Sequence, residues 1–172
     1  MKTFAKSFIA ALFVFTLAAC GAEDTSNESN STSSETSTTS TAAESVKTYV
    51  YEEEKMSVTL TLEAKPNTDI LLKQEAITRY KNLTAEELQN VIEQVEAYQV
   101  KNQGVAGVEI TGNKLSDSEY ERIVRIDFTK LGVQKAVEQN IVSQDTLSGD
   151  KRAVSLEKTE LAVKDLGFTE EK

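Results

Sequence analysis

Apolar and polar side chains alternate without interruption from residue 56 to residue 63. The apolar members are Met56, Val58, Leu60 and Leu62, and the polar members are Ser57, Thr59, Thr61 and Glu63. Because successive side chains of a β-strand point to opposite faces, this period of two predicts a strand with one buried and one exposed face. Such a strand belongs to a sheet that is covered on one side, and this limits the folds open to the chain.

The surrounding sequence predicts four more strands and three helices. We expect strands at 48–52, 70–81, 105–111 and 119–128, with turns at 53–55 and at Gly112-Asn113. Thr84 lies three residues before Glu87, which is a capping box that starts a long amphipathic helix ending near Gly104. Shorter helices are expected at 131–140 and 156–166. This order favours an α+β two-layer sandwich. In this fold, a mainly antiparallel sheet of about five strands has one long and two short helices packed on one face.

The N-terminal region predicts export and lipid attachment. Residues 1–19 have a basic start, an apolar run and small residues before Cys20, the single cysteine of the chain. The apolar run is too short to span a membrane. The sequence Leu17-Ala18-Ala19-Cys20-Gly21 resembles the lipobox of bacterial lipoproteins, in which the cysteine is acylated. An ordinary secretory signal or a buried helix is the alternative.

A change of composition after Cys20 divides the chain into three parts. We expect a lipoprotein signal peptide at 1–19, a lipidated Cys20 with a disordered Ser/Thr-rich linker at 20–46, and a folded domain at 47–172. The linker composition also permits O-glycosylation. The domain carries 17 Lys and Arg against 23 Asp and Glu, a net charge of −6. This charge repels phosphate backbones, so we expect no nucleic-acid partner.

The chemistry-bearing residues indicate binding rather than catalysis. The chain contains no histidine, which excludes a Ser-His-Asp triad and an imidazole metal site. Ser155 and Lys158 fit the S-x-x-K pattern of serine β-lactamases, but the companion motifs are incomplete and Ser155 is better explained as the cap of the last helix. We predict no catalytic residue, no metal site and no cofactor. The residues that we name as a speculative binding surface are Tyr49, Tyr51, Asn113 and Asp150.

The order of motifs in the domain is similar to that of the YehR-like bacterial lipoprotein family. The resemblance rests on the segments Thr48-Tyr49-Val50-Tyr51, Leu83 to Glu87, Gly104 to Val108, Ile126-Asp127-Phe128, Leu147 to Asp150 and Leu166-Gly167-Phe168. It implies a lipobox, a short linker and a small two-layer α/β domain. The family is a domain of unknown function and defines no catalytic residues that could be carried over to this chain.

Together these features predict a membrane-anchored extracytoplasmic lipoprotein. We expect it on the outer face of the cell membrane, anchored through palmitate-type acyl chains on Cys20, and the long linker favours a Gram-positive-type surface. Its domain is predicted to be a non-enzymatic module for an unknown envelope ligand or protein, and a structural role in envelope assembly is not distinguished from this by sequence. The alternative is a carboxylate- or Ser-Lys-dependent hydrolase acting on envelope material.

Overall fold

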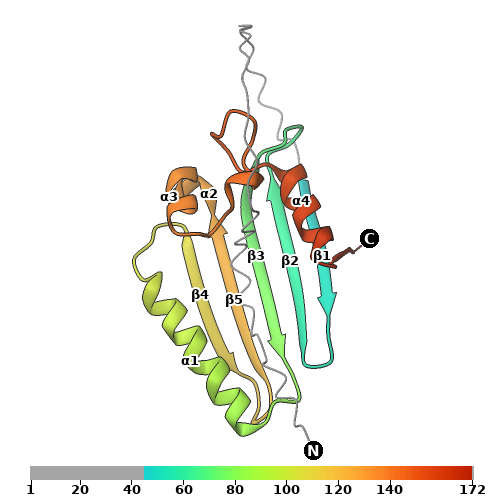
Figure 1. The fold of residues 1–172 in the computed structure, drawn as a ribbon, viewed down its shortest axis with the longest axis vertical. Helices are drawn as coiled ribbons and strands as arrows, with labels where there is room; N and C mark the ends of the chain where they lie inside the picture. Colours follow the sequence, from blue (N-terminus) through green and yellow to red (C-terminus); the bar gives the residue numbers. More distant parts are fainter. Residues whose placement is uncertain (1–44, 172) are drawn as a thin grey trace, which may run out of the picture.

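The computed structural model describes residues 45–171, which form one antiparallel sheet with helices (Figure 1). The six strands lie in the order β4-β5-β3-β2-β1-β6. Cys20 and the predicted signal peptide lie outside the described residues. The elements, in chain order, are β1 (Ser45–Glu52), β2 (Met56–Ala64), β3 (Leu71–Tyr80), α1 (Ala85–Lys101), β4 (Val108–Lys114), β5 (Tyr120–Asp127), α2 (Phe128–Leu131), α3 (Val133–Glu138), η1 (Gln144–Thr146), α4 (Leu156–Asp165) and β6 (Thr169–Glu170).

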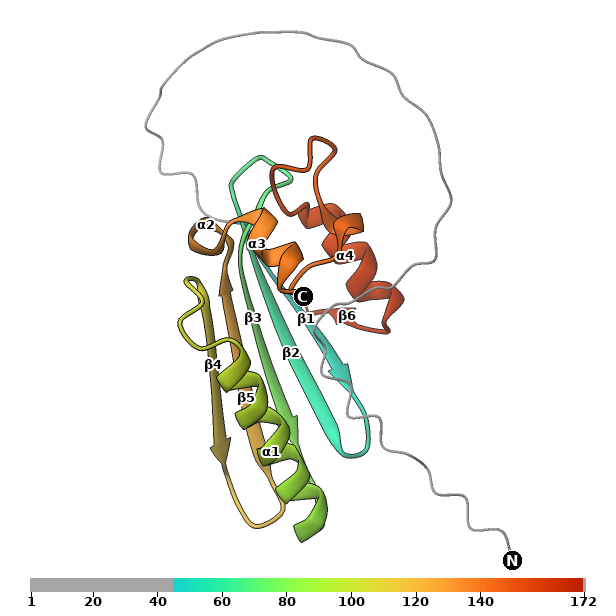
Figure 2. The same cartoon turned by 60° about the vertical axis from the view of Figure 1, so that its left-hand side comes forward.

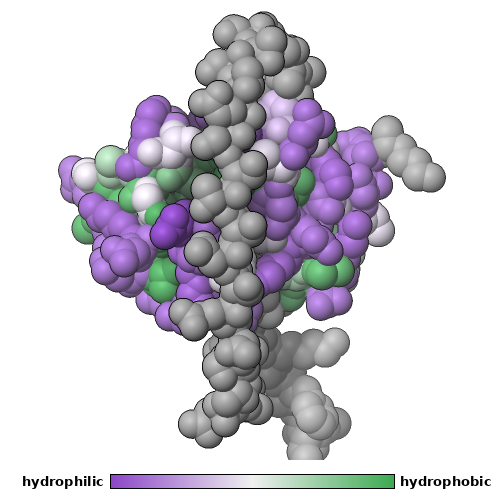
Figure 3. Space-filling view, turned by 90° about the horizontal axis from the view of Figure 1, so that it is seen from above, coloured by the Kyte–Doolittle hydropathy of each residue, from purple (hydrophilic) through white to green (hydrophobic). Residues whose placement is uncertain are grey.

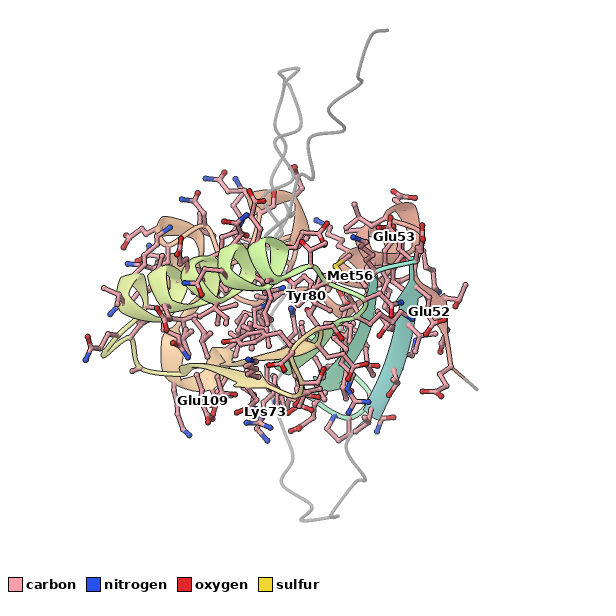
Figure 4. The ribbon with its side chains drawn as sticks, turned by 90° about the horizontal axis from the view of Figure 1, so that it is seen from below. Glu52, Glu53, Met56, Lys73, Tyr80 and Glu109 are labelled. Atoms are coloured by element: carbon pink, nitrogen blue, oxygen red, sulfur yellow. The ribbon has the colours of Figure 1, made fainter. Side chains whose placement is uncertain are left out.

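The strand register separates the side chains into a covered face and an open face. One row of cross-strand partners on the covered face contains Tyr49, Leu60, Ala76, Val124 and Ile110. Figure 4 looks along the sheet from below. It shows Met56 and Tyr80 on the side of the sheet that faces α1, whereas Lys73 and Glu109 point away from α1. The alternation at residues 56–63 therefore has the physical cause that the sequence predicts.

The helices lie over different parts of the covered face. Helix α1 runs along β4 and β5 (Figure 2), whereas α4 lies beside β1, where Lys47 of β1 forms an ion pair with Glu160 of α4. The buried residues accordingly form two hydrophobic clusters. The smaller one contains Leu88, Val91 and Val95 of α1 with Tyr120, and the larger one joins the strands to the C-terminal segments.

The helix ends follow local chemistry. Thr84 accepts a hydrogen bond from the Glu87 backbone, and Glu87 accepts one from the Thr84 backbone, so the predicted capping box is confirmed. Helix α1 ends at Lys101, before the predicted stop at Gly104. The side-chain amide of Asn102 donates to the Tyr98 carbonyl at 2.8 Å and closes the last turn.

The predicted turn at Gly112 and Asn113 is wrong, because both residues belong to β4 and the turn follows at 115–119. The reason is tertiary. A Cβ at residue 112 would lie 2.0 Å from the Tyr120 hydroxyl and 2.9 Å from Val95 Cγ1, so any larger residue would force these side chains to move where α1 approaches the strand. The predicted strand at 105–111 is accordingly displaced toward the C-terminus.

The α+β class, the mainly antiparallel sheet and the packed helices are confirmed. The structure adds β6, whose two residues pair with Tyr49 and Val50 of β1, and Phe128 begins α2 instead of ending β5. Seen from above, the visible surface is mostly hydrophilic, and hydrophobic residues occur in small groups (Figure 3). Within residues 45–171, no helix has the length and apolar character needed to cross a membrane.

Candidate functional site

A narrow groove on the covered face lies where β2, β3 and β5 meet α1 and the C-terminal segments. We call it the central groove. Its free space of about 20 Å³ is sufficient for about one water-sized group. Its floor is formed by strand residues, and its walls include Tyr98 of α1, Ile141 and Phe168. The complete lining is Val58, Leu60, Gln74, Ala76, Thr78, Tyr98, Arg122, Val124, Ile126, Ile141 and Phe168.

Arg122 is the one charged residue in this lining. It is a direct cross-strand partner of Thr78, and its side chain is almost completely buried, with a relative exposure of 4%. Its Nη2 donates a hydrogen bond to Thr78 Oγ1 at 3.1 Å, whereas its Nε has no hydrogen-bond partner within residues 45–171. Among the carboxylates of residues 45–171, none forms an ion pair with Arg122.

This arrangement is unfavourable for the protein by itself. Moving a charged group from water into a protein interior costs several kcal/mol unless an opposite charge and hydrogen bonds compensate it. The Thr78 hydroxyl satisfies only one of the five guanidinium N–H donors. The groove therefore presents an uncompensated positive charge with at least one free donor, which is a property expected of an anion-binding site.

The charge of Arg122 also affects the pKa of Tyr98. Burial raises the pKa of the Tyr98 hydroxyl above its ordinary value, and the nearby positive charge of Arg122 acts in the opposite direction. A cation lowers the pKa of a phenol because it stabilises the phenolate. Arg122 and Tyr98 both line the central groove, so a group that enters it meets the positive charge and the phenol together.

Sequence reasoning missed Arg122, although its position contains a signal. In the strand predicted at 119–128, a period of two places residue 122 on the same face as Tyr120, Val124 and Ile126. An arginine in an otherwise inward-facing series is a buried charge that needs an explanation. The structure confirms the shared face, since all four side chains are buried.

A second hollow of about 560 Å³ lies on the open face near α2, and it is larger than the central groove. Its charged side chains are paired with one another. Arg125 Nε lies 2.5 Å from Glu75 Oε2, and Lys130 Nζ lies 3.2 Å from Asp127 Oδ2. Exposed pairs of this kind contribute little free energy and leave no charge to be neutralised by a ligand. We therefore place the candidate site in the central groove despite its smaller size.

Tyr49 and Tyr51 both belong to β1 and face the helices. Tyr49 is fully buried. Lys164 Nζ lies 5.7 Å from its ring centroid. Burial, with the Glu160 and Glu170 carboxylates, raises the pKa of the Tyr49 hydroxyl. The ring centroid of Tyr51 is 5.3 Å from that of Phe168. Both tyrosines therefore contribute to packing, and Tyr51 reaches the groove wall through Phe168.

Asn113 and Asp150 lie apart from the tyrosines. Asn113 is an exposed residue of the edge strand β4. Asp150 accepts hydrogen bonds from the Ser148 hydroxyl at 2.6 Å and from the Arg152 backbone at 3.1 Å, and these bonds lower the pKa of its carboxyl. The four residues named from the sequence do not form one surface. Ligand binding by any of them stays a prediction.

Ser155 acts as the N-cap of α4, as the sequence predicts. Its hydroxyl accepts from the Lys158 backbone at 3.2 Å and donates to Asp69 Oδ2 at 2.5 Å. The Lys158 amine donates to the Leu147 carbonyl at 2.7 Å. Since Ser155 is buried and the amine is engaged elsewhere, the pair does not have the geometry of an activated nucleophile.

Comparisons with known proteins identify the family and the fold. The family described as "Protein of unknown function (DUF1307)" matches residues 45–169. The NMR structure of the E. coli YehR protein aligns with a TM-score of 0.58 and 22% identity, covering 76% of this chain and 93% of that one. An NMR structure of a Streptococcus pneumoniae protein aligns with a TM-score of 0.50 and 20% identity, covering 89% and 99%.

No curated protein sequence matches the chain. At these identities the two solved structures establish a shared fold, and the family match extends over nearly all of the described domain. The chain therefore belongs to the YehR-like DUF1307 family of proteins of unknown function.

Proposed function

We propose that this protein is a lipid-anchored extracytoplasmic binding protein. Cys20 carries the acyl chains, the Ser/Thr-rich segment separates the domain from the bilayer, and the domain binds a small anionic ligand without chemical conversion. The anchor is supported by the lipobox-like sequence around Cys20. Two acyl chains hold a protein stably on a membrane, because each buried methylene contributes about 0.8 kcal/mol.

One observation carries the binding role. Arg122 is buried, has a free Nε, and lacks an ion-pair partner within residues 45–171. A ligand with a negative charge would supply the missing counter-charge, and binding energy would come from the compensation of an existing desolvation penalty. The lining of the central groove is mostly apolar, and such surroundings strengthen the attraction between opposite charges.

The anchor is tested by cell fractionation of the full chain. Cys20→Ala should move the protein out of the membrane fraction while the folded domain stays intact, because the site of acylation is removed. Ser26→Ala in the same segment is the matched control and should fractionate as the parent does. If Cys20→Ala still partitions into detergent micelles like the parent, the lipid anchor is contradicted.

The binding role is tested by NMR titration of the mature chain, residues 20–172 with Cys20→Ser, against wall digests, peptides and envelope extracts. Backbone amides of the groove strands, β3 and β5, should shift with at least one mixture. The same titration of Arg122→Met should leave them unshifted. If no groove amide responds to any mixture, the proposed role of the central groove fails.

A further inference from the structure

We infer that the central groove binds a monocarboxylate, a ligand with one carboxylate beside an aliphatic segment, and that Arg122 and Thr78 hold the carboxylate. This inference rests on the proposed binding role of the groove and adds the chemical class of the ligand. Three features of the groove support the inference: the free N–H donors of Arg122, its single positive charge, and the apolar residues around it.

The free donors suit a carboxylate. Among the described residues, Arg122 Nε–H has no hydrogen-bond partner, and Nη2 carries a second hydrogen besides the one that it donates to Thr78 Oγ1. A planar guanidinium presents neighbouring N–H groups in a fixed fork, and a carboxylate accepts from two of them at once. Thr78, with a relative exposure of 1%, keeps its own hydroxyl hydrogen available for a carboxylate oxygen.

The charge of the groove favours a monoanion. Arg122 supplies a single positive charge, and the other lining residues are neutral. One carboxylate would bring the buried charge to zero. A phosphate monoester, with close to two negative charges above pH 7, would leave an uncompensated negative charge in the same apolar surroundings.

The walls favour an aliphatic segment next to the carboxylate. Val58 and Leu60 of β2 lie on one side of Thr78, and Val124 and Ile126 follow Arg122 along β5. The walls are completed by Phe168 and Ile141. Because the free space of about 20 Å³ has the size of one water molecule, groove side chains must move aside to admit both the carboxylate and the aliphatic segment. Short aliphatic acids are therefore the appropriate probes.

The decisive experiment follows the Arg122 Nε–H resonance of the mature chain, residues 20–172 with Cys20→Ser, during titration at pH 7.5. The probes are sodium hexanoate, 1-hexanol and hexyl phosphate, which share one alkyl chain and differ in the head group. We expect a saturable shift of the Arg122 resonance with hexanoate only. Butanoate, with two fewer methylenes, should bind about tenfold more weakly.

Two variants separate this site from general adsorption. Arg122→Met should weaken hexanoate binding by about tenfold or more, because two charge-assisted hydrogen bonds are lost. Arg125→Met removes an exposed arginine of the same strand that lies on the open face, and it should bind hexanoate like the parent. Native-like amide spectra of both variants would show that the fold is retained.

The possible results distinguish the ligand class from the binding role. An equal shift with 1-hexanol, or an equal affinity in Arg122→Met, would overturn the carboxylate inference. If hexanoate leaves Arg122 unshifted while an envelope extract shifts the groove amides, the ligand class is wrong and the binding role stands. If hexyl phosphate binds more tightly than hexanoate, the argument from charge is refuted.

Discussion

Replacing Arg122 and Thr78 together should make the protein more stable. In Arg122→Met/Thr78→Val the buried charge and the hydroxyl that accepts its hydrogen bond are both replaced by apolar side chains. A binding site often contains groups that destabilise the free protein. If removing a site residue stabilises the protein, that residue contributes to ligand binding rather than to folding.

The magnitude follows from the burial and the partners of Arg122. Burying a guanidinium costs several kcal/mol even after relaxation. The hydrogen bond to Thr78 offsets about 1.5–3 kcal/mol of this cost. Replacing buried charged groups with well-packed apolar side chains of similar volume typically stabilises a protein by about 1–4 kcal/mol. We expect a gain within this range. Thr78→Val alone should instead lower stability by about 1–3 kcal/mol, because it leaves the charge with one partner fewer.

Urea unfolding of the mature chain, followed by circular dichroism, measures these differences. The midpoint of the double variant should rise without a change in the slope of the transition, since the surface exposed on unfolding is nearly the same. A double variant that is less stable than the parent by more than about 1 kcal/mol would refute the reasoning. Arg122 would then be a structural residue whose charge is compensated in the free protein.

Three further predictions concern other parts of the domain. Gly112→Ala should lower the free energy of unfolding by about 1–3 kcal/mol in urea titrations, because its Cβ would lie 2.0 Å from the Tyr120 hydroxyl; an unchanged midpoint would contradict this. Ser155→Ala should lower it by about 1–2 kcal/mol through loss of the α4 cap, and equal stability would contradict the capping role. Lys55 lowers the pKa of the Glu87 carboxyl mainly through a side-chain hydrogen bond, so the pair stabilises the fold above the ordinary pKa of glutamate and loses this effect as pH falls through the lowered value. Lys55→Met should therefore be less stable than the parent at about pH 6, with the difference disappearing at acidic pH once the Glu87 carboxyl is protonated; a difference that is independent of pH would contradict this.

The sequence predicted the elements whose causes are local. The alternation at 56–63 and the capping box of Thr84 and Glu87 depend on neighbours along the chain, and both are present in the structure. Gly112 was interpreted as a turn because glycine is common in turns. Its actual cause is the approach of Tyr120 and Val95, which come from other elements. The two-residue strand β6 is too short to show any period.

The candidate site was predicted less well because it too depends on contacts between residues that are far apart in the sequence. The tyrosines were selected by residue type, and the fold uses Tyr49 mainly for packing. Arg122 acquires its significance only from long-range facts: within residues 45–171 its Nε has no hydrogen-bond partner, and its side-chain hydrogen bond goes to the neutral Thr78. Alternation can place an arginine on the inner face, but it cannot show whether an acidic side chain from another element meets it there.

The most direct test of the central claim is the thermal unfolding of the mature chain with and without hexanoate, compared with the same pair of measurements on Arg122→Met. Binding to the folded state alone stabilises it by about 1.4 kcal/mol when the free ligand is ten times its Kd. The account predicts a higher Tm in hexanoate for the parent chain and a clearly smaller rise for Arg122→Met at the same hexanoate concentration. Equal shifts in both proteins, or no shift in the parent at saturating hexanoate, would contradict the claim that Arg122 is the anchor of a carboxylate site.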